Sequence, residues 1–143
     1  MKLSTRTRYG MRAIIELAQH EGNRPLQLKA IAERQDISVK YLEQLMSLLR
    51  SAGFVRSVRG SKGGYVLARP ASQIMLGEIF RSLEGPVATT ECTADGEVCE
   101  RSVDCIARDI WMQVEAAIGQ ILGATSLADV VNKAHAKTSE YQI

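Results

Sequence analysis

The stretch that most constrains the fold runs from Ser38 to Leu67, where a short amphipathic helix is followed at once by a glycine-rich hairpin. Ser38 is a suitable N-cap for this helix, and Gly53 marks its end. Between them, apolar side chains recur at the i, i+3, i+4, i+7 spacing of one buried helical face. These side chains are Leu42, Leu45, Met46 and Leu49. The pattern predicts a helix that is held down on one side and free on the other.

Two alternating runs after Gly53, residues 54–58 and 65–67, predict a pair of β-strands. The turn between them, residues 59–64, holds two cations and three glycines, which supply the positive φ angles that a tight turn needs. A second, shorter helix is predicted just before Ser38, because Leu28, Ile31 and Ala32 form one apolar face. Two helices joined by a short turn and followed by a hairpin are typical of a winged helix-turn-helix.

The outward face of the predicted helix and the hairpin carry side chains that suit duplex DNA. Gln44 can bond an adenine edge with two hydrogen bonds, and Glu43 can accept one from a cytosine amino group. Arg59 can enter a narrow minor groove, where glycines let the backbone approach the duplex. A solvated helix face beside a basic turn is the alternative interpretation. The predicted DNA-binding residues are Ser38, Lys40, Tyr41, Glu43, Gln44, Ser47, Arg59, Gly60, Lys62, Gly63 and Gly64.

The charge of the chain is unevenly distributed, although its net value is only +2. Residues 1–70 contain 13 Lys and Arg against 5 Asp and Glu, a net charge of +8. Residues 71–143 contain 5 against 11, a net charge of −6. Because neutralised phosphates supply most non-specific affinity for nucleic acids, the basic half is predicted to face DNA and the acidic half to lie apart from it.

The three cysteines, Cys92, Cys99 and Cys105, lie within 14 residues of one another with the spacing C-x6-C-x5-C. In a reducing compartment, thiols grouped in this way indicate metal or redox chemistry and not a disulfide framework. The spacing lacks the tight C-x2-C of zinc knuckles, which favours an iron–sulfur cluster that takes a fourth ligand from elsewhere. A thiol redox switch, a zinc site and inert cysteines are the alternatives.

A long amphipathic helix of about 20 residues is predicted after the cysteines, since apolar residues recur from Val103 to Leu122 in steps of three and four. Its apolar stripe is wider than a compact winged helix can cover, so we expect a second copy of the chain to cover it in a two-fold dimer. Burial against the chain's own first helix, predicted from Thr5 to His20, is the alternative.

The predicted fold is mainly α with a small β-hairpin wing: a winged helix-turn-helix followed by a long C-terminal dimerisation helix. Residues 1–84 form the DNA-binding domain, 85–105 a cysteine-containing sensor loop, 106–135 the dimerisation helices and 136–143 a tail. Apolar runs of about 18 residues are missing, so we expect no membrane span and a cytoplasmic location. The sequence has no triad ordering and no phosphate loop, so we expect neither enzymatic activity nor a small-molecule substrate.

Three segments carry a resemblance to a known family: MKLSTRTRYGMRAIIELA, ISVKYLEQLMSLLRSAGFVRSVRGSKGGYVLARP and LGEIFRSLEG. Over nearly its full length, the chain resembles the Rrf2 family of bacterial winged-helix regulators. The resemblance implies a homodimer with crossing long helices that binds a pseudo-palindromic operator. It also implies that Ser38, Tyr41, Glu43, Gln44, Arg59 and Gly60, with the wing glycines, carry recognition.

The cysteine segment resembles the iron–sulfur branch of that family, whose members sense cluster supply, nitric oxide or redox state with two-iron or four-iron clusters. The first cysteine gap is one residue longer here than the commoner spacing. Arg108 stands where cluster-supply regulators have a histidine ligand, and Arg8 stands where nitric-oxide sensors have an acidic one. The remaining candidates for a fourth ligand are Glu91, Glu97, Asp104, Asp109, a residue of the other subunit, or an exogenous thiol or water.

The sequence therefore predicts a homodimeric DNA-binding transcription regulator whose operator affinity is controlled by an iron–sulfur cluster, of [2Fe–2S] or [4Fe–4S] type, on Cys92, Cys99 and Cys105. A thiol-redox or zinc-responsive regulator without a cluster is the first alternative. An iron–sulfur electron carrier is the second, but such a protein has no use for the basic half of this chain.

Overall fold

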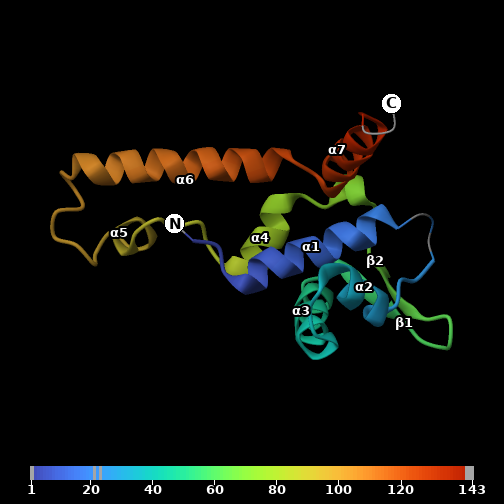
Figure 1. Ribbon diagram of the computed structural model, residues 1–143. Helices are drawn as coiled ribbons and strands as arrows, with labels where there is room; N and C mark the ends of the chain where they lie inside the picture. Colours follow the sequence, from blue (N-terminus) through green and yellow to red (C-terminus); the bar gives the residue numbers. More distant parts are fainter. Residues whose placement is uncertain (1, 21, 23, 141–143) are drawn as a thin grey trace.

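The N-terminal half is built around α1 (Thr5–Gln19), which packs against α2 (Leu28–Gln35) and α3 (Val39–Ser51) (Figure 1). A computed structural model describes residues 2–20, 22 and 24–140 of the chain. The apolar stripe of α3 is buried as predicted, because its members face α1 and the helices around it. Their core neighbours include Ile14 of α1 and Ile31 of α2.

Ser38 begins α3 as the sequence predicts: its hydroxyl accepts a hydrogen bond from the Tyr41 backbone N–H across 3.1 Å. The helix ends shortly before Gly53, whose φ of +84° turns the chain towards the wing. A further set of polar bonds ties α1 to the end of α2. Arg12 Nε donates to Gln35 Oε1 at 2.6 Å, and Gln35 Nε2 donates to Glu16 Oε1 at 2.9 Å. Hydrogen bonds thus hold the helix-turn-helix on both sides of its turn, at Gln35 before it and at Ser38 after it.

The wing consists of two antiparallel strands, β1 (Val55–Val58) and β2 (Gly64–Leu67), with Val55 opposite Leu67 and Val58 opposite Gly64. A third piece of extended chain borders β2, since Leu26 and Tyr65 exchange two backbone hydrogen bonds of 2.9 Å. This bridge fixes the start of α2 against the base of the wing.

Gly63 and Gly64 are required by the wing itself. A Cβ on Gly63 would lie 2.1 Å from the Val58 carbonyl oxygen, and a Cβ on Gly64 would lie 2.4 Å from the Leu26 carbonyl oxygen. Gly64 also has a φ of +148°, which L side chains rarely adopt. These glycines are predicted both to form the tight turn and to let the backbone approach DNA. The structure requires the first role, because side chains here would prevent the hairpin from closing and from docking on Leu26.

The spacing of Ile74, Leu76, Ile79, Phe80 and Leu83 predicts a helix over about 73–83, but the observed fourth helix starts later. A short 3-10 turn, η1 (Ala71–Gln73), precedes α4 (Leu76–Glu84), and residues 74–75 between them are extended. The reason is non-local: Met75 pairs with Ser126 in an antiparallel bridge, with hydrogen bonds from Leu76 N to Thr125 O (2.8 Å) and from Leu127 N to Ile74 O (2.9 Å). This bridge joins the start of α4 to the C-terminal part of the chain.

The C-terminal half differs from the prediction at both ends of its long helix. The predicted loop over 85–105 contains a short helix, α5 (Glu91–Ala94), before α6 (Ile106–Ala124) crosses the top of the molecule (Figure 1). After α6, a capping box of Ser126 and Asp129 starts α7 (Leu127–Glu140), with bonds of 2.9 and 3.1 Å. Residues 136–140 of the expected tail belong to α7, and 141–143 lie outside the described residues.

The observed architecture confirms the predicted fold class, a mainly helical protein with a two-stranded antiparallel wing. In the part of the chain that the structure describes, no helix is long and apolar enough to cross a membrane.

Candidate DNA interface and cysteine segment

The outward face of α3 and the wing lie together on the side of the molecule away from α6 (Figure 1). On α3, four of the predicted side chains are exposed because they stand opposite the buried leucines. They are Lys40, Glu43, Gln44 and Ser47. In the wing turn, Arg59, Gly60 and Lys62 are exposed, whereas Gly63 is buried. The structure therefore brings these four side chains of α3 and the wing cations onto one surface.

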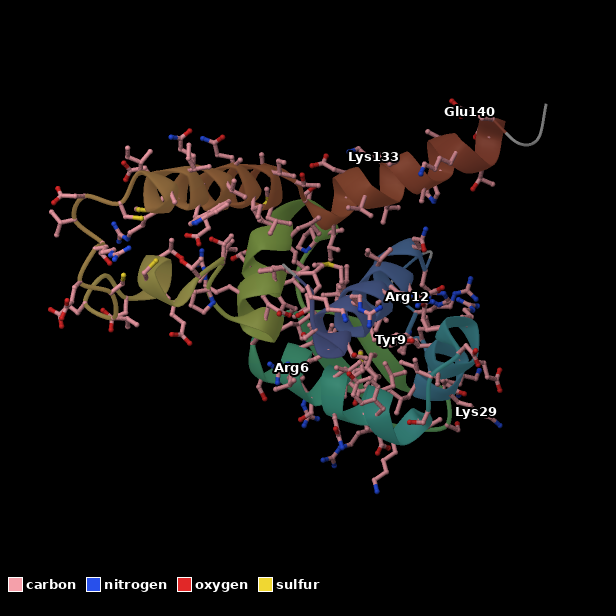
Figure 2. All side chains as sticks on the ribbon, turned by 60° about the vertical axis from the view of Figure 1, so that its left-hand side comes forward. Arg6, Tyr9, Arg12, Lys29, Lys133 and Glu140 are labelled. Atoms are coloured by element: carbon pink, nitrogen blue, oxygen red, sulfur yellow. The ribbon has the colours of Figure 1, made fainter. Side chains whose placement is uncertain are left out.

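Among the predicted DNA-binding side chains of α3, Tyr41 is the exception, because it is half-buried against α1. Its ring meets the Tyr9 ring edge to face, with the centroids 6.2 Å apart, and the Arg12 guanidinium carbon lies 5.2 Å from the centre of the Tyr9 ring. Tyr9 and Arg12 stand on the side of α1 that meets α2 and α3 (Figure 2). This stack sets the orientation of Tyr41 at the first turn of the reading helix.

A groove of about 480 Å³ lies between the start of α2 and the wing turn, and sequence reasoning missed it. Arg24, Gln27 and Lys62 line it, and Gln27 Nε2 donates to the Ser61 carbonyl oxygen across 3.4 Å. No acidic side chain lines this groove within the described residues. The local sequence carries no signal for it, because contacts between residues far apart in the sequence, such as the bridge between Leu26 and Tyr65, bring Arg24 and Gln27 beside the wing.

The three cysteines are free thiols at different depths of one segment. Cys92 is half-buried on α5, Cys99 is exposed in the following turns, and Cys105 is half-buried as the N-cap residue of α6. Among residues 2–20, 22 and 24–140, no group of three or more His, Cys, Asp or Glu side chains is arranged to hold a metal ion. The three thiols thus lie in one segment but are not arranged as a complete set of metal ligands.

The segment nevertheless suits an iron–sulfur cluster in two respects. Its three free thiols supply the soft ligands that such clusters take. Ser102, which lies between Cys99 and Cys105, is only 7% exposed, and its hydroxyl has no hydrogen-bond partner in the described structure. A buried hydroxyl without a partner costs about 1–3 kcal/mol. A coordinated thiolate or a cluster sulfide would supply an acceptor of the kind that this hydroxyl lacks.

The apolar stripe of α6 is largely exposed, and no residue of this helix is buried among those described. It packs against α4 and α5, and a groove of about 990 Å³ separates it from α1. Exposure reaches 80% at Ile106 and 68% at Ile121. The other large apolar side chains exposed on α6 are Ile110, Trp111, Met112 and Val114. Burial of the stripe against the chain's own first helix, the alternative in the sequence analysis, does not occur.

Comparison with known proteins identifies the family. The family model Rrf2, described as an iron-dependent transcriptional regulator, matches residues 3–133. The chain belongs to the Rrf2 family. Protein rrf2 of Nitratidesulfovibrio vulgaris is 42% identical to it over 94% of this chain and 89% of that protein.

Two solved structures of Rrf2-type regulators have the same fold as this chain. CymR, the global cysteine regulator of B. subtilis, gives a TM-score of 0.79 at 41% identity, over 93% of this chain and 98% of that one. IscR of T. potens gives 0.77 at 41% identity, over 94% and 88%. The protein is therefore a DNA-binding transcriptional regulator of the Rrf2 family and not an enzyme, which sets aside the electron-carrier alternative.

Proposed function

We propose that this Rrf2 regulator is a cytoplasmic homodimer whose affinity for a pseudo-palindromic operator depends on an iron–sulfur cluster held by Cys92, Cys99 and Cys105. The observation that carries the proposal is the placement of three free thiols in one segment that ends at the first turn of α6. When bound, the cluster would supply a link between the three thiols that is sensitive to oxidants and to iron supply.

The dimer is proposed from the uncovered apolar face of α6. A second copy of the chain would bury this face and extend over the groove beside it, whose apolar lining includes Met11, Phe80 and Leu122. Substitution Ile110→Glu should then yield monomers in analytical ultracentrifugation, whereas Gln120→Lys, on an exposed polar position of the same helix, should leave the dimer intact. A dimer that survives Ile110→Glu unchanged would place the interface elsewhere.

The proposed DNA-binding residues are the predicted ones on α3 and the wing, with Gln44, Glu43 and Arg59 as base or groove contacts. In a two-fold dimer, the two α3 helices meet half-sites about one helical turn apart. Because α6 connects the cysteine segment to the dimer face, a change in the position of α6 alters the separation of the two α3 helices. The operator affinity changes with this separation.

Anaerobic purification tests the cluster directly. The expected result is a coloured protein that contains iron and acid-labile sulfide, and whose operator affinity differs from that of the cluster-free dimer. Substitution Cys92→Ala should abolish the colour and leave one affinity under both conditions. A colourless dimer that binds its operator with the same affinity before and after reconstitution with iron and sulfide would overturn the proposal.

A regulator that senses through its thiols or through zinc is the second candidate. Two observations favour its thiol form: the described residues hold no assembled metal-ligand group, and the chain is similar to CymR, the global cysteine regulator of B. subtilis. The same purification separates the two candidates. A zinc-loaded or metal-free protein whose operator affinity changes on oxidation of Cys99 would support thiol or zinc sensing.

A further inference from the structure

The short helix that carries Cys92 is fastened to α6 by one carboxylate. Glu115 Oε1 accepts hydrogen bonds from the Thr89 backbone N–H (2.5 Å), the Thr89 hydroxyl (2.9 Å) and the Thr93 hydroxyl (2.6 Å). Burial opposes ionisation of Glu115, but the bonds from Thr93 and Thr89 outweigh it and lower the pKa of this carboxyl. Glu115 is therefore a charged acceptor that holds the chain on both sides of Cys92.

A second side chain of α6 reaches the same place. Arg108, two helical turns before Glu115, donates from Nε to the backbone carbonyl of Cys92 across 3.1 Å. Beside it, the Thr90 hydroxyl and the Cys92 sulfur are 3.0 Å apart. The backbone of Cys92 and the residues around it are thus hydrogen-bonded to one face of α6. Arg108 contributes to this attachment, although an arginine side chain cannot serve as a metal ligand.

The neighbouring cysteine lacks such an attachment to α6. Cys99 is exposed, and the hydrogen bonds of the turns around it stay within the segment. They run from Val98 N to Asp95 O, from Ser102 N to Cys99 O and from Asp104 N to Arg101 O. One thiol of the segment is consequently fixed to the long helix and another lies on turns held by local bonds alone.

We propose that Glu115 and Arg108 are positioning residues that hold Cys92 on α6, so that any change of state at this thiol acts on the long helix through these two side chains. The inference rests on the proposed function in that Cys92 is taken as a sensing thiol. It differs from the cluster proposal in being a property of the protein alone, which holds whether the thiol binds iron, binds zinc or is oxidised.

The test uses the reduced, metal-free full-length protein and no DNA. Iodoacetamide alkylation is followed at each cysteine by peptide mass spectrometry at one fixed pH. In the parent protein, Cys92 should react more slowly than Cys99, because alkylation of Cys92 requires α5 to leave α6. Substitutions Glu115→Ala and Arg108→Ala should each raise the Cys92 rate by about tenfold or more, since each removes at least one charge-assisted bond, and leave the Cys99 rate unchanged.

Two further variants make the result specific. Glu115→Gln removes the charge but keeps the acceptor oxygen, so the Cys92 rate should stay within about threefold of the parent value. Gln113→Ala, on an exposed position of the same helix, should change no rate. Equal acceleration by Gln and Ala at position 115 would show an electrostatic effect on the thiol and would overturn the positioning role.

Other outcomes are equally decisive. An unchanged Cys92 rate in both alanine variants, or the same rise at all three cysteines, would contradict the proposal. Because the assay needs neither metal nor operator, its failure leaves the cluster proposal untouched. Conversely, a colourless protein after anaerobic purification would refute the cluster and leave the positioning of Cys92 standing.

Discussion

The Ser4 hydroxyl donates to the Glu84 carboxylate across 2.6 Å, which joins the N-cap of α1 to the last residue of α4. The Ser4 backbone N–H and the Thr7 hydroxyl also donate to this carboxylate, and Arg6 Nε donates to the Leu83 carbonyl oxygen at 2.8 Å. Glu84 directly precedes the turn that leads into the cysteine segment. The connection therefore ties the first turn of α1 to the start of the cysteine segment.

Acid should weaken this connection. The hydrogen bond from the Ser4 side chain, followed by that from Thr7, lowers the pKa of Glu84 below its ordinary value of 4.5. A lowered pKa contributes stability that is complete above 4.5 and is lost as the pH falls through the lowered value. Urea unfolding of the parent and of Glu84→Gln between about pH 5 and about pH 3 should show a larger loss of unfolding free energy in the parent.

At neutral pH, Glu84→Ala should cost about 1–3 kcal/mol of unfolding free energy, because it leaves the donors of Ser4 and Thr7 without their charged acceptor. Glu78→Ala, on the exposed side of α4, is the comparison variant, although it also removes the N-terminal capping bond of that helix. If Glu84→Gln lost as much unfolding free energy in acid as the parent does, the acid effect would come from other carboxylates.

Base recognition is expected to depend on Gln44. Substitution Gln44→Ala should cost about 1–3 kcal/mol of binding free energy on the operator and relax the preference at one base pair of each half-site. Fluorescence anisotropy with the operator and with single-base variants measures both effects. Gln120→Ala on α6 serves as the control. If Gln44→Ala weakened binding to operator and random duplex equally, Gln44 would be a backbone contact instead of a base contact.

The groove between α2 and the wing is expected to take a backbone phosphate. Substitutions Arg24→Gln and Lys62→Gln should each lower the slope of log affinity against log salt concentration by about 1 and weaken binding to all sequences alike. Lys133→Gln, on α7 (Figure 2), should leave the slope unchanged. An unchanged slope for Arg24→Gln would remove Arg24 from the DNA contact.

The reading helix and the wing could be predicted because their signals are local. The buried spacing from Leu42 to Leu49 and the glycines of the turn act over a few residues, and they fix which side chains face outward. The groove at Arg24 and the link from Ser4 to Glu84 could not be predicted, since each depends on residues that are far apart in the sequence. The late start of α4 has the same origin in the pairing of Met75 with Ser126.

The cysteine segment shows a different limit of sequence reasoning. Spacing identifies Cys92, Cys99 and Cys105 as a group, but it says nothing about which of them is attached to the rest of the fold. Glu115 lies more than 20 residues from Thr89 and Thr93, and no local pattern links them. The distinction between a fixed and an exposed thiol emerges only when α5 is placed on α6.

The buried hydroxyl of Ser102 gives the last prediction, because it separates the metal-free protein from the loaded one. In the metal-free protein, Ser102→Ala removes a buried group without a partner, so the free energy of unfolding should stay the same or rise by up to about 1–3 kcal/mol. After anaerobic reconstitution, the same substitution should shorten the lifetime of the visible absorption in air, since an acceptor sulfur would lose its donor. Ser72→Ala, at an exposed position, is the control for both measurements. A metal-free Ser102→Ala protein that is clearly less stable than the parent would mean that the hydroxyl already has an acceptor, and its proposed use by a bound cluster would then fail.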